Sequence, residues 1–299
     1  GSLMRATRRP SGGKKDMEGL WLALYTGRFQ ETGIMSATPI RLTDCMRLSV
    51  IVITRNEQAN IADCLKGLSF ADEIIVLDNA SSDATADIAR SLAATVHVVQ
   101  DWPGFGPQKN RALALAKGEW VLSIDADERL TPELRDEISR AIASGSAPAA
   151  YRCPRRSSYC GQFMLHSGWN PDWVLRLFRR QSARFSDDLV HEKVLVEGPV
   201  GDLQSPLLHL SFPDLESVLD KVNRYSSAGA QTMAIRGGGA SLWGAIGHGL
   251  WAFVRTYVIR RGFLDGQLGL ALAISNAEGT YYRYAKRWLM LRGDRGQRP

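Results

Sequence analysis

Short apolar runs alternate with helix-forming segments between residues 48 and 143. The first run, Leu-Ser-Val-Ile-Val-Ile-Thr at 48–54, is rich in β-branched residues and does not alternate with charged ones, which is typical of a strand buried on both faces. Repetition of strand and helix indicates βαβ units. We therefore predict an α/β fold with a mostly parallel central sheet, with strands at 48–54, 73–78, 96–99 and 120–124 and helices at 60–68, 82–93, 107–117 and 131–143.

The pattern changes after residue 145. Shorter, irregular strands are expected near 150–153, 174–178 and 194–196, followed by helices at 215–235, 242–259 and 267–291. We divide the chain into three parts: an extension at 1–46, flexible or partly a tag because Gly-Ser-Leu resembles a cloning scar, an α/β domain at 47–212, and a helical region at 213–299.

The net charge of +6 is unevenly distributed. Lys and Arg number 8 against 4 acids in residues 1–47, 20 against 24 in 48–250, and 9 against 3 in 251–299. The folded middle is therefore mildly acidic, which argues against nucleic-acid binding. The basic C-terminal part favours an anionic membrane surface as partner.

The C-terminal helices leave two interpretations open. The 18 uncharged residues between Arg236 and Arg255 begin with three glycines, so the apolar stretch is too short to span a bilayer comfortably. A helix lying in the membrane interface fits the composition, and simple packing against the α/β domain is the alternative.

Cysteine usage favours a reducing compartment. The four cysteines form no Cys-x-x-Cys pair, and no signal peptide is legible. We therefore expect a cytoplasmic protein.

Polar clusters follow three of the predicted strands, at 54–57, 78–83 and 125–128. Ligands of open α/β sheets bind outside the carboxyl ends of the strands, so we expect the clusters to converge on one crevice. Capping of the next helix is the alternative for each cluster taken alone. Asp125 and Asp127 flank one residue, which in extended chain directs both carboxylates to one face, and such oxygen ligands suit Mg²⁺ or Mn²⁺.

The three polar clusters resemble motifs of a known protein family. The strand followed by Thr-Arg-Asn-Glu at 54–57, the Asp-Asn-x-Ser-x-Asp run at 78–83 and the Asp-x-Asp pair at 125–127 resemble the nucleotide-sugar half of family 2 glycosyltransferases, inverting enzymes of the Rossmann-like GT-A fold. The segment at 257–266 is similar to the bacterial branch containing lipopolysaccharide core β-1,4-glucosyltransferases. The resemblance implies a metal-dependent hexosyltransferase.

The resemblance also implies roles for single residues. Asp125 would lie near the ribose and donor sugar, and Asp127 would bind the metal. Asp83 either caps the helix that follows or touches ligand. The donor UDP-sugar would be held by Thr54, Arg55, Asn56, Glu57, Asp78, Asn79, Ser81 and Asp125.

Lys109 and Arg111 lie on the helix before the metal strand. They could approach phosphate or sugar, but a solvated helix face is the favoured interpretation.

An inverting displacement needs one carboxylate to take the proton of the acceptor hydroxyl. The candidates are Asp187, Asp188 and Glu192; we favour Glu192, which enters a strand, with Asp188 second. His191 is either a metal ligand or a structural residue. Trp169 and Arg176 are candidate acceptor residues, because Trp stacks on sugar rings and Arg clamps anionic groups.

The resemblance implies transfer of glucose from a UDP-sugar to a lipid-linked heptose of the lipopolysaccharide inner core, at the cytoplasmic face of the bacterial inner membrane. Two alternatives remain. A sugar-1-phosphate nucleotidyltransferase would carry a glycine-rich loop where this chain has Thr-Arg-Asn-Glu. A nucleotide-sugar-binding or membrane scaffold protein would show no turnover.

Overall fold

The computed structural model describes residues 46–145, 147–187 and 192–296. The proposed extension, apart from Met46, and the candidates Asp188 and His191 therefore lie outside the described residues.

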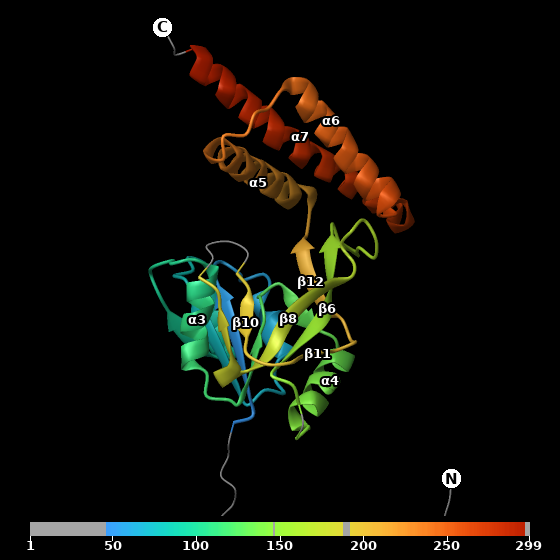
Figure 1. Ribbon diagram of the computed structural model, residues 1–299. Coiled ribbons are helices and arrows are strands. Elements are labelled where there is room, and N and C mark those ends of the chain that lie inside the picture. Colours follow the sequence, from blue (N-terminus) through green and yellow to red (C-terminus); the bar gives the residue numbers. More distant parts are fainter. Residues whose placement is uncertain (1–45, 146, 188–191, 297–299) are drawn as a thin grey trace, which may run out of the picture. The chain divides into compact units, whose positions relative to one another are not determined.

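A mixed sheet forms the centre of the α/β domain (Figure 1). Its first four strands are parallel to one another, as the alternation of strand and helix predicted. Strand β8 then pairs antiparallel with β4 and joins the later strands to the same sheet. The sheet order is β3 (Thr95–Val98), β2 (Glu73–Asp78), β1 (Leu48–Thr54), β4 (Trp120–Ser123), β8 (Asp172–Arg179), β6 (Ala150–Tyr159), β12 (Leu207–Phe212) and β5 (Glu128–Leu130), with β7 (Gln162–Phe163) and β11 (Val200–Asp202) beside β6.

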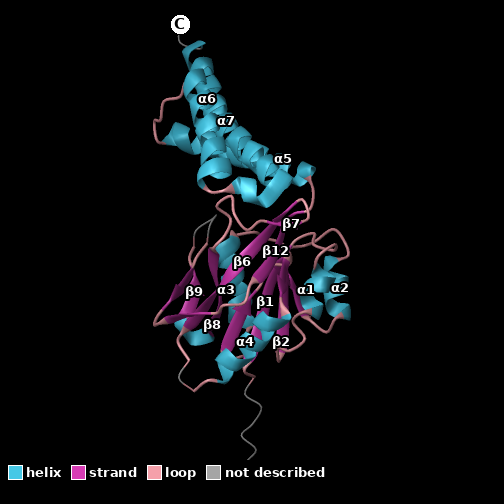
Figure 2. Ribbon diagram, turned by 90° about the vertical axis from the view of Figure 1, so that its right-hand side faces the viewer, coloured by secondary structure: helices cyan, strands magenta, loops and turns pink. Residues whose placement is uncertain are grey.

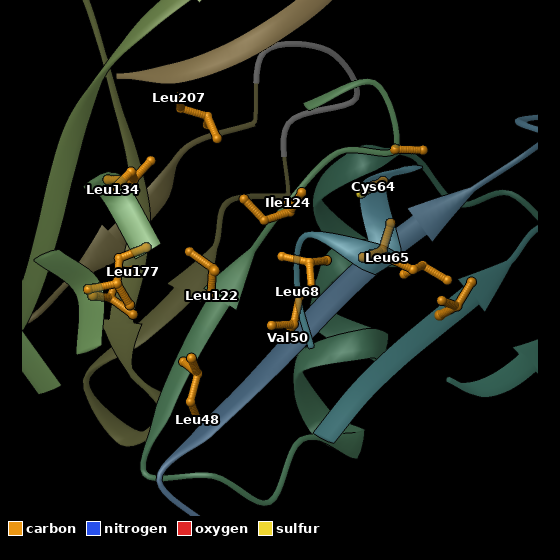
Figure 3. Close-up of a cluster of buried hydrophobic side chains, with 14 of the residues drawn as sticks. Leu48, Val50, Cys64, Leu65, Leu68, Leu122, Ile124, Leu134, Leu177 and Leu207 are labelled. Atoms are coloured by element: carbon orange, nitrogen blue, oxygen red, sulfur yellow. The ribbon is translucent and has the colours of Figure 1, made fainter. Parts of the chain in front are cut away.

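One face of the sheet is covered by three helices: α1 (Ile61–Lys66), α2 (Thr85–Ser91) and α4 (Pro132–Ala143). Helices α1 and α2 lie side by side (Figure 2). Figure 3 shows Leu48 and Leu122 of the sheet in one apolar cluster with Leu65 of α1. This packing uses alternate residues of each strand, because successive side chains of a strand point to opposite faces.

The opposite face is covered by α3 (Phe105–Leu115) and by a hairpin of β9 (Ala183–Phe185) and β10 (Val194–Val196). Ile51 and Val121, the intervening strand residues, pack here with Ala112 of α3. Burial on both faces explains the continuous apolar character of β1.

Local signals placed most element boundaries within a few residues. Helix α4 begins as predicted, with Thr131 Oγ1 accepting a hydrogen bond from Leu134 N and Pro132 in the first turn. Strands β5, β7, β9 and β11 were missed because two or three residues are too few to show a period. Strand β12, of six residues, was also missed.

The C-terminal region is a bundle of α5 (Leu215–Ile235), α6 (Leu242–Val254) and α7 (Gly266–Gly296), with a π-turn at Arg255–Ile259 and a 3₁₀ turn at Gly262–Asp265 (Figure 1). Polar and apolar contacts tie the bundle to β6 and the loop after β7. Tyr159 Oη lies 2.9 Å from Ser275 Oγ, and the Asp265 carboxylate accepts from the backbone of His166. The bundle therefore packs against the α/β domain, and an interfacial position of α6 stays a prediction. Among the described helices, none has the length and apolar character to cross a membrane.

Candidate functional site

A cavity of about 740 Å³ opens at the carboxyl ends of β1 and β4. Two of the three predicted clusters line it, through Thr54, Arg55 and Glu57 and through Asp125 and Asp127. The other lining residues are Ile53, Trp102, Phe105, Lys109, Ala126, Glu192, His209, Arg224 and Tyr225. The fold therefore brings six of the predicted site residues to one cavity: Thr54, Arg55, Glu57, Asp125, Asp127 and Glu192.

Lys109 joins two of the predicted carboxylates. Its ammonium lies 3.0 Å from Asp125 Oδ1 and 2.8 Å from Glu192 Oε1, with only 4% of its side chain exposed. The expected solvated position for Lys109 was wrong, because α3 packs this side chain into the cavity wall. Glu192 was expected to be fixed by a strand, but β10 starts at Val194, and the lysine orients the carboxylate instead.

Gly106 permits this approach. A Cβ at this position would lie 1.8 Å from the backbone oxygen of Ser186, so only glycine lets α3 pass this close to the chain that leads towards Glu192.

Arg176 lies behind Asp125. Its guanidinium pairs with Asp125 and with the fully buried Glu128, and its own side chain is 11% exposed. The predicted contact of Arg176 with acceptor therefore does not fit the structure, because the arginine is used to hold the Asp-x-Asp turn. Burial opposes ionisation of Asp125, but Arg176 and Lys109 outweigh it and hold the pKa of this carboxyl well below its ordinary value.

Asp127 has a different partner. Its Oδ2 lies 3.1 Å from Nε2 of His209, a residue of β12 that the sequence analysis missed. The expected common face of Asp125 and Asp127 is only partly realised: both line the cavity, but they sit in a turn after β4 and contact different groups. A lone histidine in an apolar strand, 82 residues from its partner, carries no spacing signal.

The hydrogen bonds of His209 suit a metal ligand. Nδ1 lies 2.9 Å from the hydroxyl oxygens of Ser157 and Ser211, which can orient the ring and leave Nε2 directed at Asp127. A carboxylate oxygen and an imidazole nitrogen fit Mn²⁺, with remaining positions for phosphate oxygens and water. Within the described ranges, no group of three or more His, Cys, Asp or Glu side chains forms a complete metal cage, so a metal here would depend on its substrate for ligands.

Asp78 connects two of the predicted donor loops. Its carboxylate accepts hydrogen bonds from Thr54 Oγ1, at 3.0 Å, and from Ser81 N, at 2.9 Å, and it is 1% exposed. Ser81 Oγ in turn accepts from Asn56 N. Asp78 and Ser81 thus support the cavity wall without lining it. Asn79 does not line it either, and contact of these three residues with uracil or ribose stays a prediction.

Three other candidate residues lie outside the cavity. Asp83 Oδ1 accepts from Thr85 N at the start of α2, which is the capping role weighed for it. Arg111 pairs with Asp101 at the surface, as the solvated interpretation held. Asp187 is exposed and does not line the cavity.

Burial also changes the pKa of Glu57, another acid in the wall of the 740 Å³ cavity. It raises the pKa of Glu57, which accepts a hydrogen bond from Asn60 Nδ2.

The C-terminal bundle contributes to the site. Arg224 and Tyr225 of α5 line the cavity beside His209. Trp169 lines an adjoining cavity of about 310 Å³, which also contains His209. This position is compatible with the acceptor role expected for Trp169.

Comparisons with known proteins identify the family that this chain matches. The model of glycosyl transferase family 2 matches residues 49–194. A Rickettsia typhi protein named as an uncharacterized glycosyltransferase is 32% identical over 252 residues, covering 80% of this chain and 86% of the relative. The lipopolysaccharide core biosynthesis glycosyltransferase LpsC of Rhizobium meliloti is 28% identical over 256 residues, covering 80% and 93%. A solved mannosyltransferase of Pyrobaculum calidifontis, in complex with GDP-Man and Mn²⁺, has 18% identity and a TM-score of 0.47, covering 83% and 88%.

Proposed function

The chain belongs to glycosyltransferase family 2, and on this premise we propose that it transfers a sugar, glucose being our best choice, from a UDP-sugar to a lipid-linked saccharide with inversion at the anomeric carbon. The proposed acceptor is a heptose of the lipopolysaccharide inner core. The similarity to LpsC supports this class of acceptor.

One observation carries the proposal: a carboxylate held by a lysine and a carboxylate paired with a histidine line the same cavity. Glu192 lies 2.8 Å from Lys109, and Asp127 lies 3.1 Å from His209. The first pair supplies an oriented proton acceptor. The second pair supplies an oxygen and a nitrogen ligand for a divalent cation.

In the proposed reaction, Glu192 takes the proton of the acceptor hydroxyl while that oxygen attacks the anomeric carbon. The bond from this carbon to the diphosphate oxygen breaks, and UDP leaves with the bonding electron pair. Lys109 keeps the Glu192 carboxylate directed at the cavity throughout. Asp127 and His209 would hold Mg²⁺ or Mn²⁺, which when bound neutralises charge on the diphosphate.

We further propose that the protein works on the cytoplasmic face of a bacterial inner membrane, with α6 at the lipid surface. Trp243, Leu250 and Val254 lie along one side of α6 and are 81%, 64% and 40% exposed. Arginines at 255, 260 and 261 follow this apolar stripe, which is the arrangement of an interfacial helix on anionic lipid.

The proposal is tested by UDP release from a panel of UDP-sugars with Mn²⁺ or Mg²⁺ and a heptose-terminated lipid A-core glycolipid. One donor should give acceptor-dependent turnover. Glu192→Gln should reduce turnover by about 10²–10⁴-fold, because the proton acceptor is lost. Glu197→Gln is the matched control, since Glu197 is exposed and does not line the cavity.

Retained turnover in Glu192→Gln would refute the assignment of the base. Binding of a UDP-sugar without turnover in the presence of metal and acceptor would instead favour the nucleotide-sugar-binding alternative.

A further inference from the structure

A second large cavity, of about 450 Å³, lies where the bundle meets β6, β12 and the loop after β7. Its size is within the range of small-molecule sites. Residues from α5, α7 and the turn after α6 form most of its wall, together with Tyr159, Trp169 and Phe212 of the α/β domain. Among the residues that the structure describes, no predicted donor or metal residue lines it.

The cavity wall is strongly cationic. Lys221, Arg255, Arg260 and Arg283 line it, and no Asp or Glu of the described part of the chain does. These four side chains form no ion pair among the described residues. Four cations around one cavity, with no acid in its lining, favour an anionic ligand.

Two glycines make room for two of these arginines. A Cβ at position 229 would lie 2.9 Å from Arg283 Cδ, and one at position 168 would lie 2.4 Å from Arg260 Cδ. Each arginine therefore lies directly against backbone, which limits the positions open to it. Arginine in a restricted position favours bidentate contact with a carboxylate or phosphate.

The cationic cavity adjoins the reaction site. Trp169, Phe212 and Lys221 also line the 310 Å³ cavity that contains His209. Tyr225 is shared with the cavity that contains Asp127 and Glu192. The cationic cavity is therefore a direct neighbour of the cavities that contain the reacting groups.

The remaining wall leads to the proposed membrane surface. Arg255 begins the turn that contains Val258 and Ile259, whose side chains are 55% and 57% exposed, and Arg260 directly follows that turn. A molecule held here would have lipid on one side and the reaction site on the other.

We propose that this cavity binds the anionic part, phosphate or carboxylate, of the saccharide head group of the lipid-linked acceptor. The proposal rests on the proposed function, since it names the charge that the acceptor must carry. It assigns Arg260 and Arg283 to acceptor recognition rather than to donor binding.

The test measures flotation of the full chain with phosphatidylcholine vesicles that contain the heptose-terminated lipid A-core glycolipid. Arg260→Gln/Arg283→Gln should weaken binding by about tenfold or more, because contacts to charged groups are lost. Arg236→Gln/Arg292→Gln removes the same charge from exposed positions of the same bundle outside the cavity and should bind like the wild type. Thermal unfolding checks that both variants are folded.

Wild-type protein is also tested with dephosphorylated and with carboxyl-reduced glycolipid, which separates the two sources of anion. A loss with either one supports the proposal and identifies the group. Unchanged binding of Arg260→Gln/Arg283→Gln, or equal loss in the control variant, would overturn it. So would binding of both neutralised glycolipids as tightly as the native one, or no binding of the native glycolipid. UDP binding by the wild type is measured separately, so failure of the proposed transferase function is recognised independently.

Discussion

Replacing Lys109 by methionine tests whether this lysine stabilises the site and orients Glu192. The substitution removes the ammonium that contacts Asp125 and Glu192 and keeps a side chain of similar length. Asp125 retains Arg176, whereas Glu192 loses its ion pair. In the variant, the Glu192 carboxylate, which is 18% exposed, therefore lies near the partly buried Asp125 without a cation between them.

The expected cost follows from this geometry. Removing one partner of a buried ion pair costs about 3–5 kcal/mol, but Asp125 keeps a cation and is 32% exposed, so we expect about 2–3 kcal/mol. For a protein of this size this corresponds to a fall in Tm of about 5–10 °C. Turnover should fall on the order of 100-fold, because Glu192 loses its orientation.

The pH dependence gives an independent readout. Lys109 contributes to the lowered pKa of Asp125, and a lowered folded pKa stabilises the protein above the unfolded value and is lost as the pH falls through the folded one. With a smaller shift, Lys109→Met should begin to unfold in acid at a higher pH than the wild type.

Urea and thermal unfolding measure these changes, with Lys66→Met as control. Lys66 pairs with Asp63 at the surface, both mostly exposed, so its loss should cost less than about 1 kcal/mol. A double-mutant cycle with Glu192→Gln isolates the pair. Equal stability of Lys109→Met and Lys66→Met would refute the reasoning, as would a coupling energy near zero.

Three further outcomes are expected. His209→Ala should weaken Mn²⁺ binding in the presence of UDP by about 10–100-fold in calorimetry, and unchanged affinity would exclude this residue as a ligand. Cys64 and Cys153 should resist iodoacetamide at pH 8 until the protein unfolds, because burial raises both thiol pKa values to about 12; mass spectrometry locates the alkylated sites. Trp243→Glu/Trp251→Glu should reduce sedimentation with phosphatidylglycerol vesicles without lowering Tm, and full retention would contradict an interfacial α6.

Much of the fold is determined by residues that are close together in the sequence. Strand β1 and the cap at Thr131 depend on residues close together in sequence, so periodicity and capping rules located them. The family resemblance rested on the polar residues that end β1, β2 and β4, and the family match confirms it. The carboxyl ends of parallel strands meet at one edge, which is why Thr54 and Asp127 were expected in one cavity.

The contact partner of each site residue could not be predicted from the sequence. Residue type and spacing marked Asp125, Asp127 and Glu192 as candidates, but the lysine that joins two of them and the histidine that faces the third come from α3 and β12. The contacts of Glu192 with Lys109 and of Asp127 with His209 span 83 and 82 residues. Such contacts depend on how helices and strands pack, and no local pattern records that packing. Sequence therefore determines the chemistry available at the strand ends, and packing selects which groups pair, because charge pairing requires proximity in space.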